Sequence, residues 1–455
     1  MSTTFLRRSL RRLRLPLGRH LLTFTSLSSA GLGETVLPTL SLIALVRVTG
    51  AETSGHVIFA QSLASFWFLV FDPCLERATQ RFVPIEQERT GHGCALFLRL
   101  LRLDAGIALA ATVVALAAVL GAWMLGILSA DLALMLVLSV AGRGVMAPYG
   151  MAFTGFAIAD RLRVSGLLRV QGALVSFGLS LAGLFTGGPL LYLAGQAVGA
   201  LLVAAVLCLL ASRAVAQSLG PAVGSPRLPA GMLRFTLPTS IGTIVAGISD
   251  TGILTIAGFV GGPPLVTILK ITMAPGRFYA TLATPVAAML YPRLAQAVAR
   301  GAGAAVIKRD IARTTLLMTG GGALTAAIAL PMLGTVITVA YGAEFADTGV
   351  VAMLLLGAAC VKGLVCWCNV LPLATGKPGW RLAYLCAEAA LLVAALLIAA
   401  WTATAALTTA LLFAWGRLVI AILGTGFWIT SLRRVITSES HVRLPDSAAR
   451  PTQSA

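Results

Sequence analysis

Long runs of apolar residues, separated by short polar segments, dominate the pattern of this chain. A helix needs about 20 mainly apolar residues to cross the hydrocarbon core of a bilayer. Runs of that length recur over most of the 455 residues. They are continuous, and they do not alternate between apolar and polar positions as the strands of a transmembrane barrel do. The pattern therefore predicts an all-α integral membrane protein.

We expect about 12 transmembrane helices from these runs. Their lengths of roughly 20 to 27 residues suit tilted helices that rise about 1.5 Å per residue. In chain order the expected spans cover residues 21–46, 56–75, 103–128, 132–157, 165–185, 189–210, 235–259, 265–290, 314–339, 349–375, 380–401 and 405–431.

The basic residues set the expected orientation. The chain has 34 Lys and Arg against 16 Asp and Glu. If the N-terminus is cytoplasmic, 28 of the 34 fall on the cytoplasmic side, one (Arg47) falls outside, and five lie within spans. Cytoplasmic loops of membrane proteins collect Lys and Arg in this way. We therefore predict that both termini are cytoplasmic, that the protein lies in a bacterial inner membrane, and that nucleic acid is not a partner.

The two halves of the chain look alike. Glu34 follows Arg19 by fifteen residues in the first span, and Asp250 follows Arg234 by sixteen residues in the seventh. Each half also has a glycine turn followed by a basic stretch, at 88–104 and 299–314, which predicts a short amphipathic helix on the membrane surface. Such repeats are common in transporters.

The repeat divides the chain into five expected parts. They are a basic cytoplasmic N-terminus (1–20), a first six-helix lobe (21–210), a cytoplasmic linker (211–234), a second six-helix lobe (235–431) and a disordered cytoplasmic tail (432–455).

Charged side chains inside the spans are the candidate functional residues. One charge at the bilayer centre costs about 2.5–3.5 kcal/mol on insertion scales. The candidates for a cationic substrate cavity are Arg143, Lys270, Arg277, Lys362 and Arg417. The acidic candidates, as coupling or salt-bridge groups, are Glu34, Asp250 and Glu388.

Three interpretations of these charges remain open. They could form salt bridges between neighbouring helices, their long stems could reach the membrane interface (most readily for Lys270), or they could line a water-filled cavity. Lys270 and Arg277 are seven residues apart and so share one helix face. A cavity rich in cations favours an anionic substrate, because phosphate oxygens are natural partners of Arg and Lys. The acids could neutralise these cations or bind H⁺ or Na⁺ as the coupling ion.

Other chemistry has little support in the sequence. Cys366 and Cys368 flank a tryptophan with no nearby His, so packed thiols are expected and neither a metal site nor a cofactor is predicted. The external turns are short, which argues against an enzyme such as a polymerase or ligase. A nucleotide-binding P-loop is absent from the sequence.

Four segments resemble a known family. They are VFDPCLERATQRFVP (from Val70), RFTLPTSIGTIVAGISD (from Arg234), MLYPRLAQAVARG (from Met289) and VAYGAEFADTG (from Val339). In order and spacing the chain resembles, over about residues 20–430, the polysaccharide-biosynthesis branch of the multidrug/oligosaccharidyl-lipid/polysaccharide (MOP) exporter superfamily, which includes the O-antigen flippases.

The resemblance implies a fold and a function. The fold would be a V-shaped, MATE-like pair of six-helix lobes. The function would be alternating-access transport of a polyprenyl-(pyro)phosphate-linked oligosaccharide for lipopolysaccharide or exopolysaccharide synthesis. Arg143, Arg277, Lys362 and Asp250 would line the cavity, and membrane lipids and polysaccharide polymerase or assembly proteins would be partners. Cation-coupled multidrug antiporters and peptidoglycan-precursor flippases share this fold and are the alternatives, since fold does not name the substrate.

Overall fold

The computed structural model describes residues 17–224, 228–229, 231–299, 304–374 and 378–437, and every regular element in these ranges is a helix. The predictions for residues 1–16, for 225–227 and 230 of the linker and for 438–455 of the tail lie outside the described residues. The long helices are α2 (Leu17–Phe71), α4 (Gly93–Met124), α7 (Leu162–Leu219), α9 (Ile253–Ala299), α10 (Ala304–Tyr341), α13 (Pro378–Thr402) and α14 (Ala406–Thr437). The shorter ones are α3 (Leu75–Thr90), α5 (Ala130–Met146), α6 (Tyr149–Ile158), α8 (Met232–Gly247), η1 (Ile248–Gly252), η2 (Ala343–Thr348), α11 (Gly349–Leu364), η3 (Cys366–Asn369) and α12 (Leu371–Ala374).

Three of the long elements are helical hairpins. The 58 residues of α7 would measure about 87 Å as one straight helix, far more than a bilayer core. The backbone instead leaves the helical region at Gly50 in α2 (φ 75°), at Gly188 in α7 (φ 73°) and at Gly262 in α9 (φ 73°). Such positive φ values are readily adopted only by glycine. Each of these glycines therefore marks a turn between two helices.

Close packing shows that α7 folds back on itself. A Cβ added to Gly183 would lie 2.1 Å from the carbonyl oxygen of Leu191, and one added to Gly195 would lie 2.3 Å from that of Leu179. The two contacts are symmetric about Gly187. The second half of α7 therefore runs antiparallel to the first, with glycines letting the backbones meet.

The number of spans agrees with the expectation. Within the described ranges, nine helical runs are long and apolar enough to cross a membrane. Three of them contain the turns at Gly50, Gly188 and Gly262, so dividing them there gives twelve segments. All three turns fall in predicted gaps between spans. The all-α, multi-pass membrane class is thus confirmed.

Local details differ from the sequence prediction. The predicted span 132–157 is broken at Pro148 into α5 and α6, because proline lacks the N–H that would continue the helix. The predicted surface helices at 88–104 and 299–314 are wrong as separate elements. Their basic stretches open α4 and α10 without a break, and the separate amphipathic helix is α3, before the turn at Gly91.

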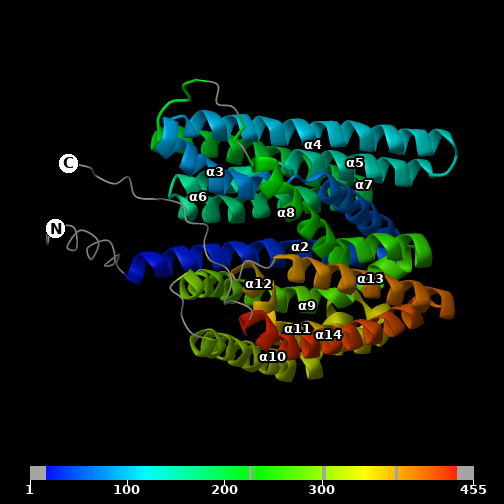
Figure 1. Ribbon diagram of the computed structural model, residues 1–455. Helices are drawn as coiled ribbons and strands as arrows, with labels where there is room; N and C mark the ends of the chain where they lie inside the picture. The colour runs from blue at the N-terminus through cyan, green and yellow to red at the C-terminus, as the bar shows by residue number, and fades with distance from the viewer. Residues whose placement is uncertain (1–16, 225–227, 230, 300–303, 375–377, 438–455) are drawn as a thin grey trace, which may run out of the picture.

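Helix α2 lies between the two halves of the molecule. It packs against α7 of the N-terminal half and against α9 of the C-terminal half. In Figure 1, α3 to α7 gather on one side of α2, and α9 to α14 gather on the other. The charged residues that matter below come from helices on both sides of this division.

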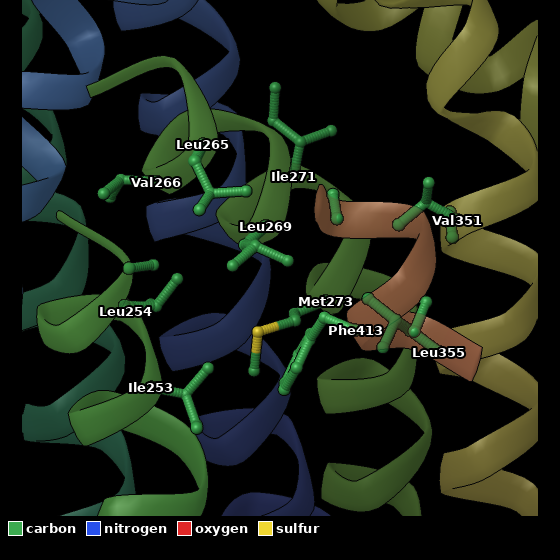
Figure 2. Close-up of a cluster of buried hydrophobic side chains, with 14 of the residues drawn as sticks. Ile253, Leu254, Leu265, Val266, Leu269, Ile271, Met273, Val351, Leu355 and Phe413 are labelled. Carbon is green, nitrogen blue, oxygen red and sulfur yellow. The ribbon is translucent and has the colours of Figure 1, made fainter. Parts of the chain in front are cut away.

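An apolar cluster joins the halves at the end of the bundle that carries the turns at Gly50 and Gly262, which we call the turn end. Val46 and Ile58 of α2 are buried in one cluster with Leu254 and Leu265 of α9. Figure 2 shows the α9 side chains of this cluster together with Val351 and Phe413 from the C-terminal half. The cluster closes the turn end with apolar packing.

Polar contacts reinforce the turn end. The hydroxyl of Thr267 donates to the carbonyl of Ala51 over 2.7 Å. Arg47 at the end of the first half of α2 donates from Nε to the carbonyl of Ala340 over 2.9 Å, and from Nη2 to Val339. These carbonyls belong to the C-terminal turn of α10, where the helix dipole favours a cation.

Arg47→Ala is therefore expected to loosen the turn end. An exposed cation at a helix C-terminus contributes about 1 kcal/mol. The equilibrium constant between the closed and the opened turn end should therefore shift about fivefold toward the opened form. The measurement is thiol labelling of a cysteine placed at Ala340 or Ala51 in otherwise equal backgrounds. Unchanged labelling in Arg47→Ala would show that the apolar cluster alone holds the closure.

Candidate functional site

The charged residues of the spans gather around cavities in the interior. A central cavity of about 300 Å³ lies between the halves, a C-half cavity of about 380 Å³ lies within the C-terminal half, and an N-half cavity of about 590 Å³ lies within the N-terminal half. The three differ in their charge. That difference decides what each could bind.

The central cavity is cationic. Arg143 of α5 faces it from the N-terminal half, and Lys270 and Arg277 of α9 face it from the C-terminal half. Asp250 is its single acidic residue among the described lining, so cations outnumber carboxylates three to one. A neighbouring space of about 420 Å³ shares Asp250, Lys270 and Arg277 and adds Glu34. Lys270 and Arg277 therefore do share one face of α9.

Arg277 is the one cation of this cavity with an ion-pair partner. Its Nη2 and Nε both lie 2.9 Å from Oδ1 of Asp250. In the described part of the chain, Arg143 and Lys270 form neither a hydrogen bond nor an ion pair. Two long cationic side chains thus face the cavity without a carboxylate within salt-bridge distance among the described residues.

Asp250 sits on an irregular turn of helix. It belongs to η1, a π-helical segment between α8 and α9. Single π turns inside α-helices widen the backbone and are frequent at functional sites. Gly252 lies next to the ring of Phe66 of α2, with 3.3 Å between that ring and an added Cβ. Small residues around η1 thus let α2 approach the turn that carries the carboxylate.

The C-half cavity holds the other predicted charges. Asp250 and Arg277 line it as well, so it adjoins the central cavity, and Lys362 of α11, Glu388 of α13 and Arg417 of α14 complete it. Lys362 donates to Oε1 of Glu388. Nη1 of Arg417 and Oε2 of Glu388 are buried and have no hydrogen-bond partner among the described residues. The cavity therefore keeps one unused donor and one unused acceptor.

The N-half cavity is acidic. Glu34, Asp72, Glu76 and Asp104 line it, against two guanidinium groups, those of Arg143 and Arg169. Glu34 accepts from Nε of Arg169 at 2.7 Å and also from Nη2 of Arg169 and the hydroxyl of Tyr149. This fork geometry is the strong, bidentate form of an arginine–carboxylate pair.

The structure places seven of the eight predicted residues around the central cavity and the C-half cavity, and it places Glu34 elsewhere. Arg143, Lys270, Arg277 and Asp250 meet in the central cavity, and Lys362, Glu388 and Arg417 join Arg277 and Asp250 in the C-half cavity. Glu34 belongs to the N-half cavity and to the neighbouring space. Each of the three acids forms an ion pair with a base from its own half.

Sequence reasoning missed Arg169. The charge count placed it with the cytoplasmic segment before the fifth span, although it lies inside the predicted span 165–185. Its guanidinium lies 5.1 Å from the ring centre of Phe153, which adds a cation–π contact to the Glu34 pair. The signal was available: it is one more arginine in an apolar run, opposite an unpaired glutamate in another run.

Arg169→Ala is expected to leave Glu34 inside the N-terminal half without its counter-ion. Breaking a partly buried ion pair by removing one partner costs up to about 3 kcal/mol, since the pair is 20–30% exposed. We expect a lower melting temperature of the purified protein, and Glu34→Gln in the same background should restore part of it. A double variant no more stable than Arg169→Ala would contradict this account.

Metal chemistry finds no support in the arrangement of side chains. Across the described ranges, no group of three or more His, Cys, Asp and Glu residues could hold a metal ion. Cys366 and Cys368 are buried, free thiols within η3. The arrangement of the cavities instead suits the reversible binding of a charged ligand.

Comparison with known proteins gives a fold. The sequence matches no protein-family model and no curated protein. The structure is similar to an inward-facing multidrug resistance MATE family transporter of the MOP superfamily, with a TM-score of 0.65 and 14% identity over 89% of this chain and 96% of that chain. A mutant of the Vibrio cholerae MATE transporter VcmN gives a TM-score of 0.65 and 12% identity, over 92% and 97% of the two chains. An outward-facing MATE family transporter of the MOP superfamily gives 0.57 and 12%, over 91% and 96%.

These likenesses span almost the whole length of both chains, so the fold is that of the MATE transporters of the MOP superfamily. At 12–14% identity the likeness defines the fold alone. The substrate has to be argued from the cavities of this chain.

Proposed function

We propose that this protein is a membrane transporter that moves a polyprenyl-(pyro)phosphate-linked oligosaccharide across the bacterial inner membrane by alternating access. The observation that carries the proposal is the cationic central cavity. In the described part of the chain Arg143 and Lys270 form neither a hydrogen bond nor an ion pair, and three cations of this cavity face one carboxylate. Isolated charges within a membrane protein are costly and mark substrate pathways.

A phosphate or pyrophosphate group supplies the missing charge. Arg binds phosphate oxygens through a two-pronged fork, and Lys binds them as a point charge. The polar side chains Gln61 and Gln196, joined by a 2.7 Å hydrogen bond, also line the cavity and can bind sugar hydroxyls. The central cavity thus offers partners for both parts of a phosphate-linked oligosaccharide.

The origin of the cations supports alternating access. Arg143 comes from α5 in the N-terminal half, and Lys270 and Arg277 come from α9 in the C-terminal half. A rocking motion of one half against the other would separate these groups and release the phosphate. The apolar cluster at the turn end closes one side of the site in this structure.

A coupling ion would act through the paired acids. Glu34 and Asp250 each hold an arginine, so H⁺ or Na⁺ arriving at either carboxylate competes with that arginine. An arginine released from its carboxylate becomes free to bind the anionic substrate. Polysaccharide polymerase and assembly proteins would receive the translocated product.

The test is transport of a fluorescent lipid-linked oligosaccharide in proteoliposomes that contain the purified chain. We expect movement between leaflets with the protein and none with liposomes alone. A matched lipid that carries the same sugar on an uncharged linkage should not move. Equal movement of the charged and uncharged lipids would overturn the proposed role of the cavity cations.

The acidic N-half cavity favours a second function, which is export of cationic drugs by antiport. The four carboxyl groups of this cavity, against two guanidinium groups, would suit a cationic ligand. The protein also shares its fold with multidrug transporters. A drug-susceptibility panel on a deletion strain distinguishes the two functions. Increased susceptibility with intact surface polysaccharide supports the second function and contradicts the first.

A further inference from the structure

An apolar groove lies between α13 and α14, away from the central cavity. It has a volume of about 570 Å³, and its lining includes Trp380, Tyr384 and Leu391 of α13 and Leu423 and Phe427 of α14. The rings of Tyr384 and Phe427 stack with centroids 6.2 Å apart and form part of its wall. Among the described residues that line the groove, Glu388 alone is charged.

The groove adjoins the C-half cavity. Glu388 and Ile420 line both spaces. On α14 the residues Arg417, Ile420, Gly424 and Phe427 are spaced by three or four positions, so they share one helix face. Ten residues separate the first from the last, which corresponds to about 15 Å along the helix. One face of α14 thus leads from a buried guanidinium to an apolar surface.

The inner end of the groove carries unused hydrogen-bonding capacity. Within the described ranges, Nη1 of Arg417 is buried without a hydrogen-bond partner, and Lys362 is bound to Oε1 of Glu388 alone. A buried guanidinium that lacks an acceptor is costly and is satisfied by an anionic oxygen. A phosphate at this point would accept from Arg417 and would compete with Glu388 for Lys362.

We propose that the groove between α13 and α14 holds the isoprenoid chain of a prenyl phosphate while its phosphate binds Arg417 and Lys362. This assignment rests on the proposed function and deepens it. A headgroup inside the protein remains attached to a long apolar chain, and that chain needs an apolar path outward from the charged cavity. The groove is such a path, and it begins next to the two cations that suit the phosphate.

The adjoining cavities give the phosphate a route. Asp250 and Arg277 line both the central and the C-half cavity, so an anion bound in one is adjacent to the other. In the predicted orientation the C-terminal end of α14 is cytoplasmic. The isoprenoid chain would then lie in the cytoplasmic half of the bilayer while the phosphate headgroup is already inside the protein.

Photocrosslinking tests the groove directly. The probe is a long-chain prenyl phosphate with a diazirine at the far end of the chain, added to the full-length protein in phosphatidylcholine nanodiscs. Digestion and mass spectrometry should locate the crosslinks on α13 and α14. Prenyl alcohol of the same chain length, carrying the same diazirine, should crosslink there about tenfold less, because it lacks the phosphate.

Matched variants sharpen the result. Ala387 lines the groove, whereas Ala390 is exposed on the same helix outside it. Ala387→Trp should lower the crosslinking yield about tenfold, and Ala390→Trp should leave it unchanged. Glu388→Gln should raise the affinity for the prenyl phosphate about tenfold, since it removes the carboxylate that competes for Lys362.

The outcomes separate this inference from the function on which it rests. Crosslinks spread evenly over the outer helices, or equal for phosphate and alcohol, would mean ordinary bilayer contact and overturn the groove assignment. Transport that persists in Ala387→Trp would also overturn it, while leaving the flippase function intact. Phosphate-dependent crosslinks in the groove, without any transport of a lipid-linked oligosaccharide, would support the groove and contradict the proposed function.

Discussion

Arg277→Ala is expected to abolish transport of an anionic lipid-linked substrate while the protein still reaches the membrane. The side chain lines both the central and the C-half cavity and is the one cation common to them among the described lining residues. A hydrogen bond to a charged group contributes about 1.5–3 kcal/mol, so affinity for the phosphate should fall roughly 10- to 100-fold. Binding of a prenyl phosphate to the purified protein measures this loss without relying on transport.

Removal of Arg277 also leaves Asp250 unpaired, and a second variant separates the two effects. Asp250→Asn with Arg277→Ala restores the local charge balance but not the phosphate partner. The double variant should therefore recover thermal stability and remain inactive. Arg277→Lys, which keeps the charge and loses the fork, should keep part of the affinity. An active double variant would show that Arg277 serves only to neutralise Asp250.

Gly55→Ala is expected to have the largest effect at the turn end. A Cβ at Gly55 would lie 2.2 Å from the carbonyl oxygen of Pro263, a backbone atom that cannot rotate aside. The hairpins of α2 and α9 would have to separate. Overpacking of this kind costs about 1–3 kcal/mol. We expect a lower melting temperature, greater thiol labelling of a cysteine at Ala51, and impaired transport.

Gly121→Ala is the matched control for this change. Gly121 lies within α4, and an added Cβ there meets nothing within 4 Å. Alanine stabilises an open helical position by about 0.5–1 kcal/mol relative to glycine. The same substitution should thus destabilise at one site and stabilise at the other. Equal effects at both positions would show that close approach at Gly55 does not hold the turn end together.

The sequence was sufficient to predict the span pattern because its signal is physical and local. Apolar length sets a crossing, and glycines at 50, 188 and 262 allow the positive φ of a tight turn. The break at Pro148 was less visible, since the apolar run continues through it. The helical stretches after Gly91 and before Thr314 were wrongly predicted as separate surface helices. A run of basic residues indicates where a helix meets the membrane surface, but it does not determine where that helix ends.

The candidate site was partly predictable. Seven-residue spacing placed Lys270 and Arg277 on one face, and their positions within an apolar span marked them as costly charges. The pairing of Lys362 with Glu388 could not be inferred, because it depends on how α11 and α13 pack. The acidic N-half cavity was missed for a similar reason. Asp72 and Glu76 are neighbours in the sequence, but Glu34 and Asp104 lie about 30 or more residues away from them, and the four meet only in the fold.

The ion pairs within each half have an electrical consequence. Glu34, Asp250 and Glu388 each carry a built-in counter-ion from the same half, so each pair moves as a nearly neutral unit when that half moves. One elementary charge crossing a 100 mV membrane potential changes the free energy by about 2.3 kcal/mol. In the described ranges Lys270 and Arg417 then remain as cations of the C-terminal half outside these pairs, whereas in the N-half cavity Arg143 lies beside the unpaired carboxylates of Asp72, Glu76 and Asp104. A bound pyrophosphate would cancel much of the charge of Lys270 and Arg417, so movement of the C-terminal half should be less sensitive to voltage with substrate bound than without it.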